Sequence, residues 1–309
     1  MTPTPDHFED FVRYRSANLG YESRDYERNC WDFYSSRPNA QWIDNEHFCM
    51  GTYPFMDGHA FGFFELKGGT KESQQEAWSE ARAQYEGPLY GPINGSTFLP
   101  YKFISMTDGS PVFPGEWDND PKVAEFFNSC NPKKVIEYRS AYRTYYDGVI
   151  EVSEPYLQGW YDKGFSLQPL DLSSEGTPKA LLEMIDAIFK NNWGYESMTN
   201  EQFQAWLESM TVGSPNIPLL YWVQIKEQRV GFAYLSELPD ATIIFKTAGI
   251  LPEFQAMGVG NAMAGQLHKL AKSRSAEKCI YALVQVDNRV NRMPDPDVTD
   301  MRRYETYIF

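Results

Sequence analysis

A glutamine and two glycines, spaced as Gln255-x-x-Gly258-x-Gly260, follow an apolar stretch and precede an amphipathic one. Where such a loop opens a helix, successive backbone N–H groups point inward and the helix N-terminus adds roughly half a positive charge. Glycine also lets phosphate oxygens approach the backbone closely. The stretch 255–262 is therefore predicted to bind a pyrophosphate without any lysine.

Three other interpretations of the glycines compete. A tight turn uses glycine where a helix and a strand pack closely, and for the two glycines alone this explanation is equally good. The dinucleotide-binding fingerprint fits poorly, because its GxGxxG follows the first strand directly and needs an acidic residue roughly 20 positions further on. A P-loop fits worse, because no Gly-Lys-Ser/Thr follows.

The longer string decides between these interpretations. Residues 251–260 read Leu-Pro-Glu-Phe-Gln-Ala-Met-Gly-Val-Gly, which resembles the pyrophosphate-binding motif of GNAT (GCN5-related) N-acetyltransferases. The order of elements predicted over 165–309 is also similar to theirs. It comprises a strand, two helices, three antiparallel strands, the motif helix and a strand that ends near Asn288.

The resemblance implies a site for acyl-CoA, with acetyl-CoA as co-substrate and no metal. Backbone amides would hold the pyrophosphate, and Ile250 would pair with the pantetheine arm through main-chain hydrogen bonds. Asn288 matches an asparagine that contacts the cofactor in the family, although a turn asparagine explains it equally well. The implied cofactor-binding residues are Ile250, Gln255, Ala256, Met257, Gly258, Val259, Gly260, Asn261, Ala262 and Asn288.

The catalytic groups are harder to assign. Acyl transfer to an amine needs a neutral nucleophile and a proton for the leaving thiolate. Many family members carry a glutamate base on the strand before the motif, but 241–250 has no carboxylate; Glu237 and Asp240 precede it and suit a turn better. The usual acid is a tyrosine several residues past the asparagine, and 289–296 contain none. Tyr304 is assigned as the catalytic acid if the chain folds back there, with aromatic packing as the competing explanation.

The second half is predicted in more detail. A helix begins at Thr177-Pro178, with a capping hydroxyl and a proline at the first helical position. Another begins at Thr199, where Gln202 completes a capping box. A loop over 252–260 leads into the motif helix. The predicted strands are 165–170, 219–225, 230–236, 241–251 and 279–286, the last of them apolar throughout, as at a sheet centre.

The first half echoes this order weakly. Residues 46–55 and 59–66 are predicted to form a hairpin, and 71–85 a helix. Gly68-Gly69 precedes that helix without the motif spacing. The predicted fold class is therefore α/β with a mixed sheet: a GNAT fold, tandem with a degenerate N-terminal copy. The predicted domains are 1–155 and 156–309, because periodic patterns lapse over 148–164.

Composition excludes several classes of function. The net charge of -14 repels polyanions and no basic stripe offsets it, so we expect no nucleic-acid partner. The 4 cysteines and 4 histidines are scattered, which predicts neither a disulfide framework nor a zinc site. A polar, acidic start predicts no signal peptide, and no apolar run approaches the roughly 20 residues of a membrane span. We expect a cytoplasmic protein.

These observations predict an acyl-CoA-dependent N-acyltransferase. It would transfer acetyl to a primary amine of a small molecule or peptide by direct attack, as a monomer with pseudo-dimeric halves or as a homodimer. Transfer of a longer acyl chain is the enzymatic alternative. A non-catalytic acyl-CoA-binding regulatory module is the other, favoured by the missing strand carboxylate and the missing tyrosine.

Overall fold

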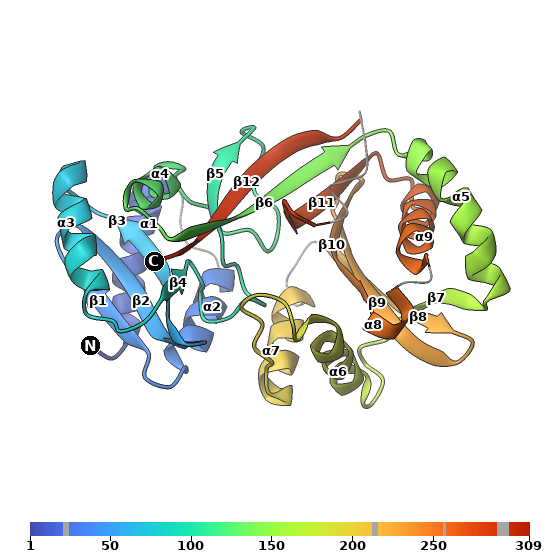
Figure 1. The fold of residues 1–309 in the computed structure, drawn as a ribbon, viewed down its shortest axis with the longest axis horizontal. Coiled ribbons are helices and arrows are strands. Elements are labelled where there is room, and N and C mark those ends of the chain that lie inside the picture. The colour runs from blue at the N-terminus through green and yellow to red at the C-terminus, as the bar shows by residue number, and fades with distance from the viewer. Residues whose placement is uncertain (21–24, 212–215, 256–257, 289–296) are drawn as a thin grey trace. The chain divides into compact units, whose positions relative to one another are not determined.

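The structure is a computed structural model that describes residues 1–20, 25–211, 216–255, 258–288 and 297–309 (Figure 1). Contacts between Cα atoms divide it into two compact units. Unit 1 consists of Met1–Arg139, Gln285–Asp287 and Met301–Phe309, and unit 2 of Ser140–Val284 and Asn288–Asp300. The units divide within strand β6 (Lys134–Arg143). The predicted boundary between residues 155 and 156 lies inside helix α5 (Asp147–Asp162) and stays a prediction.

Unit 1 is a mixed sheet with helices. The parallel pair is β3 with β4, and β12 runs antiparallel to both β4 and β5. The segment Met301–Phe309, which contains most of β12, therefore completes the sheet of the N-terminal unit. The helices are α1 (Pro5–Leu19), α2 (Asp25–Ser35), α3 (Lys71–Arg82) and α4 (Lys122–Ser129). The strands lie in the order β1 (Gln41–Asp44), β2 (Phe48–Phe55), β3 (Gly58–Leu66), β4 (Leu89–Gly91) and β12 (Thr299–Ile308), and β5 (Phe103–Thr107) also pairs with β12.

Aromatic side chains fill both faces of the β2–β3 hairpin. On one face, Phe63 makes edge contacts with Phe11 of α1 and Trp31 of α2, at centroid distances of 5.4 and 5.2 Å. On the other face, Phe61 and Phe64 contact Trp78 of α3. Aromatic rings bury large areas and prefer such tilted geometries, so this hairpin is the centre of the core of unit 1.

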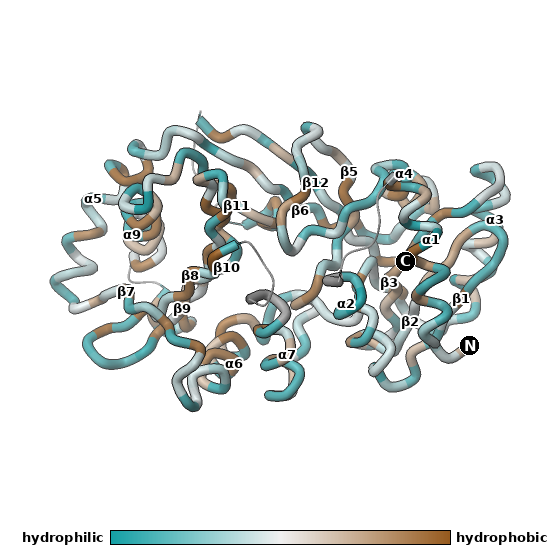
Figure 2. The backbone as a smooth tube through the Cα atoms, turned by 180° about the vertical axis from the view of Figure 1, so that it is seen from behind, coloured by the Kyte–Doolittle hydropathy of each residue, from teal (hydrophilic) through white to brown (hydrophobic). Residues whose placement is uncertain are grey.

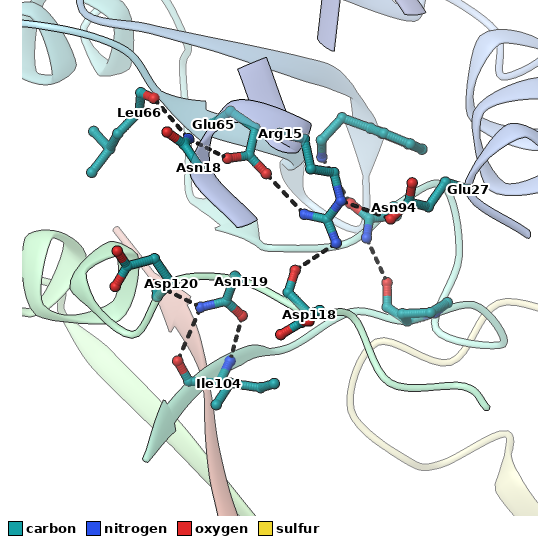
Figure 3. Close-up of polar contacts among 12 residues, drawn as sticks. Arg15, Asn18, Glu27, Glu65, Leu66, Asn94, Ile104, Asp118, Asn119 and Asp120 are labelled. Atoms are coloured by element: carbon teal, nitrogen blue, oxygen red, sulfur yellow. Dashed lines mark hydrogen bonds and ion pairs between the residues drawn. The ribbon is translucent and has the colours of Figure 1, made fainter. Parts of the chain in front are cut away.

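A buried arginine ties the elements of unit 1 together (Figure 3). Arg15 of α1 is 2% exposed; its Nε donates to Glu27 Oε1 at 2.7 Å and its Nη1 to Glu65 Oε1 at 2.8 Å. Its Nη2 donates to the Asp118 carbonyl, and its guanidinium stacks on Trp117. Removing one partner of such a buried ion pair typically destabilises a protein by about 3–5 kcal/mol. Arg15 therefore fixes α1 and α2 against β3.

Unit 2 is also a mixed sheet, and its central strands are strongly hydrophobic (Figure 2). Strand β10 is parallel to β11 and antiparallel to β9. From residues 140–143 of β6 the order continues β11 (Lys278–Gln285), β10 (Thr242–Ile250), β9 (Gln228–Glu237), β8 (Ile217–Ile225) and β7 (Phe165–Pro169). The helices are α5, α6 (Thr177–Phe189), α7 (Asn200–Thr211), α8 (Pro252–Gln255) and α9 (Val259–Ser273).

Helices cover both faces of the sheet of unit 2. Phe232 and Ala233 are neighbours in β9, so their side chains point to opposite faces. Phe232 contacts Phe189 of α6, whereas Ala233 lies in the core with Val259 and Leu267 of α9. Helices α6 and α9 therefore lie on opposite sides of the sheet.

The strongly patterned segments form the elements predicted for them. The predicted hairpin is present as β2–β3, the predicted antiparallel strands 219–225 and 230–236 pair as β8 and β9, and the capping box of Thr199 with Gln202 forms. The predicted cap at Thr177 is wrong: the N-cap is Gly176 in a left-handed conformation, and Thr177 is buried inside the helix. Residues 148–164, where periodicity lapses, are mostly helix α5. No helix in the described ranges is both long and apolar enough to cross a membrane.

Candidate functional site

Strands β10 and β11 separate part-way along their length. Their parallel register runs from Thr242 opposite Lys278 to Phe245 opposite Tyr281. Strand β10 continues to Ile250, and over the described residues this continuation is in register with β9 alone. One edge of the strand segment 247–250 is thus available to a ligand that hydrogen-bonds to backbone.

The two strands diverge at a point held by helix α9. Leu283 of β11 has a φ of 57°, a left-handed conformation that is rare for leucine and interrupts the ladder. Phe245, which is in the last pair of this register, stacks on His268 of α9 with 4.8 Å between ring centroids. Nδ1 of His268 lies 2.7 Å from the Ala264 carbonyl oxygen, which can only accept, so Nδ1 donates. Nε2 then accepts from the Tyr281 hydroxyl at 2.6 Å.

This histidine is neutral. Burial lowers the pKa of His268 to about 4, and the nearby Arg143 charge lowers it further, against the effect of the Ala264 bond. A neutral imidazole that joins α9 to β11 fixes the helix against the strand pair where the strands part. The hydrogen bond between His268 and Tyr281 therefore positions the start of α9 relative to the open strand edge.

The N-terminus of α9 is exposed at two glycines. The N-cap Gly258 has a φ of 74°, and no side chain caps the helix within the described part of the loop. A Cβ atom at Gly260 would meet none of the described residues within 4 Å, so the first turn has open space on that side of them. Because first-turn N–H groups have no partner inside a helix, the amides of 259–261 are free of intrahelical bonds. Val259, 3% exposed, anchors the turn in the core.

The structure brings most of the predicted cofactor residues together. Ile250 ends the open strand edge, and Gln255 Nε2 donates to its carbonyl at 2.9 Å, so this glutamine fixes the loop. Val259 and Ala262 have buried side chains and can offer only their backbone. Ala256 and Met257 lie outside the described residues. Asn288 is exposed in the turn after β11.

The carboxylates considered as bases lie elsewhere. Glu237 is in register with Ile243, near the start of β10 and far along the strand from Ile250, and it pairs with Arg274 at the C-terminal end of α9. Asp240 accepts from the Thr242 N–H in the β9–β10 turn. Neither carboxylate is at the open strand edge.

Tyr304 lies in the core of unit 1. It is 1% exposed on β12, and its hydroxyl donates to Glu116 Oε1. Nη1 of Arg302 also donates to both carboxylate oxygens of Glu116, whose Oε2 in addition accepts from the Phe113 N–H at 2.8 Å. These contacts fit a structural role, and the catalytic assignment stays a prediction.

The corresponding place in unit 1 is filled by its own chain. Over the described residues, the parallel pairing of β3 with β4 is limited to His59 opposite Leu89 and Ala60 opposite Tyr90. Beyond it, the Phe63 N–H donates to Asn94 Oδ1 at 2.7 Å and the Ile93 N–H donates to the Phe61 carbonyl at 2.6 Å. The following helix α3 is capped, since Thr70 Oγ1 accepts from the Ser73 N–H. At both the edge of β3 and the start of α3, the chain itself therefore supplies hydrogen-bond partners.

Sequence reasoning missed the helix that flanks the candidate site. Helix α5 runs antiparallel to α9: Asp147 pairs with Lys272 near one end, and the Tyr161 hydroxyl accepts from Gln266 near the other. The spacing of the buried residues Ser153, Leu157 and Trp160 indicates a helix face. The glycines and the internal Pro155 masked that signal.

Comparison with known proteins defines the class. Residues 179–292 match the family model described as acetyltransferase (GNAT) family. The segment 179–292 is thus similar to the GNAT family, and this likeness supports an acyl-transfer function. No curated protein matches the chain.

Solved structures extend the fold to the whole chain. A GCN5-related N-acetyltransferase from Anabaena variabilis has a TM-score of 0.59 at 10% identity, covering 100% of this chain and 71% of that one. A tandem GNAT protein from the clavulanic acid biosynthesis pathway has a TM-score of 0.52 at 9% identity, covering 100% and 96%. The GCN5-related glucosamine N-acetyltransferase region of a fungal multi-domain GH3 β-N-acetylglucosaminidase has a TM-score of 0.56 at 11% identity; 99% of this chain is covered, and it spans 37% of that chain. These likenesses show a tandem GNAT fold.

Proposed function

We propose that the chain is an acyl-CoA-dependent N-acyltransferase that transfers acetyl to a primary amine of a small molecule or peptide. One observation carries the proposal: over the described residues, a helix start without a side-chain cap, at Gly258 and Gly260, comes one short helix after an open strand edge that ends at Ile250. The first can hold a pyrophosphate and the second can hydrogen-bond to an extended amide-containing arm. Acyl-CoA contains both groups.

The residues present fit this ligand. The space at Gly260, which a side chain would occupy, is where phosphate oxygens would approach the amides of 259–261. When bound, acyl-CoA supplies an activated thioester. The chain would hold its phosphates at α9, orient its arm along 247–250 and leave the acyl end near Phe245 and Tyr281, where the strands meet. Among the described residues, no group of three or more His, Cys, Asp or Glu could hold a metal ion.

A substitution at Gly260 tests the site. Gly260→Glu should place a carboxylate in the cradle and weaken CoA binding by at least about 3 kcal/mol, comparable to losing bonds to a charged group. Gly148→Glu is the matched control. A Cβ atom at Gly148 would also meet none of the described residues within 4 Å, and Gly148 lies at the end of α5 that packs near the C-terminal end of α9. Calorimetry of both folded variants measures the effect. Equal CoA affinity in Gly260→Glu and the parent would reduce the motif to a packing turn.

A non-catalytic acyl-CoA-binding module is the second candidate. Two observations favour it: Glu237 and Asp240 lie away from the open edge of β10, and the Tyr304 hydroxyl is bound to Glu116 in the core of unit 1. Release of free thiol from acetyl-CoA with a panel of amines separates the two functions. An enzyme releases thiol in an amine-dependent manner, and a binding module releases none above background.

The partners and location remain proposals. The net charge of -14 supports a chain without a nucleic-acid partner. We propose a cytoplasmic protein without a membrane partner, either a monomer with pseudo-dimeric halves or a homodimer. Sedimentation at several concentrations distinguishes these oligomeric states.

A further inference from the structure

An exposed tyrosine lies beside the candidate phosphate site. Tyr156 of α5 is 43% exposed, and a Cβ atom placed on Gly258 would lie 3.6 Å from its Cδ1. The ring therefore borders the helix start without blocking it. Helix α5 precedes the segment 179–292 that matches the family, so this ring comes from outside that segment.

Helix α5 holds this ring in a fixed place. Gly265 of α9 lies so close to α5 that an added Cβ would be 2.5 Å from Ser153 Cβ. One turn further along, Leu157 is buried in the core of unit 2. Glu154 Oε1 pairs with Lys269 Nζ at 2.8 Å, and the Tyr161 hydroxyl accepts from Gln266 Nε2 at 2.5 Å. Contacts on both sides of Tyr156 thus make its position a property of the packed helix pair.

The chemistry of the proposed ligand gives this ring a partner. CoA carries its pantetheine arm on one side of the pyrophosphate and its adenosine on the other. With the pyrophosphate at the amides of 259–261 and the arm along the strand edge, the adenosine would extend away from that edge. A base that reaches an exposed aromatic face can stack on it with little loss of rotamer freedom, because tyrosine has few rotatable bonds. We propose that Tyr156 stacks on the adenine base of acyl-CoA and so forms the nucleotide end of the site. This inference rests on the proposed function.

Ligand fragments test the inference. Tyr156→Ala should weaken CoA binding about 5- to 50-fold, and binding of adenosine 3′,5′-bisphosphate by a similar factor. Binding of 4′-phosphopantetheine, which lacks the base, should stay within twofold. Tyr156→Phe keeps the ring and should bind all three ligands like the parent. Val152→Ala is the control, because Val152 is also a solvent-accessible apolar residue of α5, 68% exposed and one turn away.

Each outcome is decisive. If the parent binds CoA and Tyr156→Ala binds it equally well, the inference alone is wrong. An equal loss for CoA and 4′-phosphopantetheine would also overturn it, because the ring would then support the loop or the arm. If the parent binds no CoA, the proposed function is wrong and the inference falls with it. Unchanged thermal unfolding of Tyr156→Ala shows that the helix pair is intact.

Discussion

At the scale of single residues, His268 links pH to stability. Its pKa in the folded chain is about 4, chiefly through burial, compared with about 6.5 in an unfolded chain. Between these two pKa values the unfolded state binds more protons than the folded state. The contribution of His268 to stability is therefore complete above pH 6.5 and is lost as the pH falls toward 4. Two tyrosines face it, Tyr146 and Tyr281, and burial raises the pKa of both hydroxyls, so neither loses its proton in that window.

We therefore expect His268→Gln to flatten the pH dependence of stability. The parent should lose up to about 3 kcal/mol through this residue between pH 6.5 and 4. Glutamine can still accept from the Tyr281 hydroxyl but does not titrate. Denaturant unfolding of both proteins at pH 7.5, 6 and 5 gives the comparison. Parallel curves would show that His268 does not control this dependence.

Tyr304 allows a direct separation of two roles. Its hydroxyl binds a buried carboxylate, so Tyr304→Phe should lower the free energy of unfolding by about 1–3 kcal/mol. The catalytic assignment predicts something different: kcat falls by about 10²–10⁴-fold while CoA affinity is unchanged. Measuring the free energy of unfolding and kcat of Tyr304→Phe distinguishes the structural role from the catalytic one. A kcat within about threefold of the parent removes Tyr304 from the reaction.

At the scale of elements, the parallel pairs β3–β4 and β10–β11 differ in what lies against the strand edge beyond the paired residues. In unit 1 a Cβ atom at Gly62 would lie 2.3 Å from the Ile93 carbonyl oxygen, so the chain itself packs against β3. Gly62→Ala should destabilise the protein by about 2 kcal/mol through overpacking. Gly68→Ala is the control, because its Cβ would meet only the Glu46 carbonyl, at 4.0 Å. Equal stability of the two variants would mean that the segment after β4 moves aside easily.

The same difference predicts one acyl-CoA per chain. Asn94, 1% exposed, and Ile93 use the backbone groups of β3 that a ligand would need, and Thr70 caps α3. Calorimetric titration of the parent should give one equivalent of CoA, and Gly260→Glu should abolish it. Two equivalents, or tight residual binding in the variant, would show a working site in unit 1.

The elements that could be predicted from sequence are those whose signal is local. The string over 251–260 combines a strand end, glycines and a helix start within ten positions, and the structure has that order. Helix α5 was missed because Gly148, Pro155 and Gly159 obscure its apolar spacing. The partners of β12 could not be predicted, because the pairing of Tyr307 with Gly91 depends on contacts between residues far apart in the chain.

At the scale of the whole molecule, the division of the chain predicts which fragments fold. The fragment 165–309 lacks α5 and residues 140–143 of unit 2, and it carries a β12 without its partners β4 and β5. It should be poorly soluble or inactive. The fragment 140–300 keeps α5 over α9 and omits most of β12, so it should be soluble and bind CoA. Circular dichroism and calorimetry of both fragments test this, and a well-folded, CoA-binding 165–309 would contradict it.

The position of β12 also bears on the order of events during synthesis. Tyr307 and Phe309 belong to the core of unit 1, whose other residues leave the ribosome much earlier. At about 5–20 residues per second, the intervening residues 140–300 occupy roughly ten to thirty seconds. During that interval the edge of β4 that β12 later covers lacks its partner, and open strand edges invite pairing with other chains. Unit 1 should therefore depend on chaperones during synthesis for longer than its position near the N-terminus of the chain suggests.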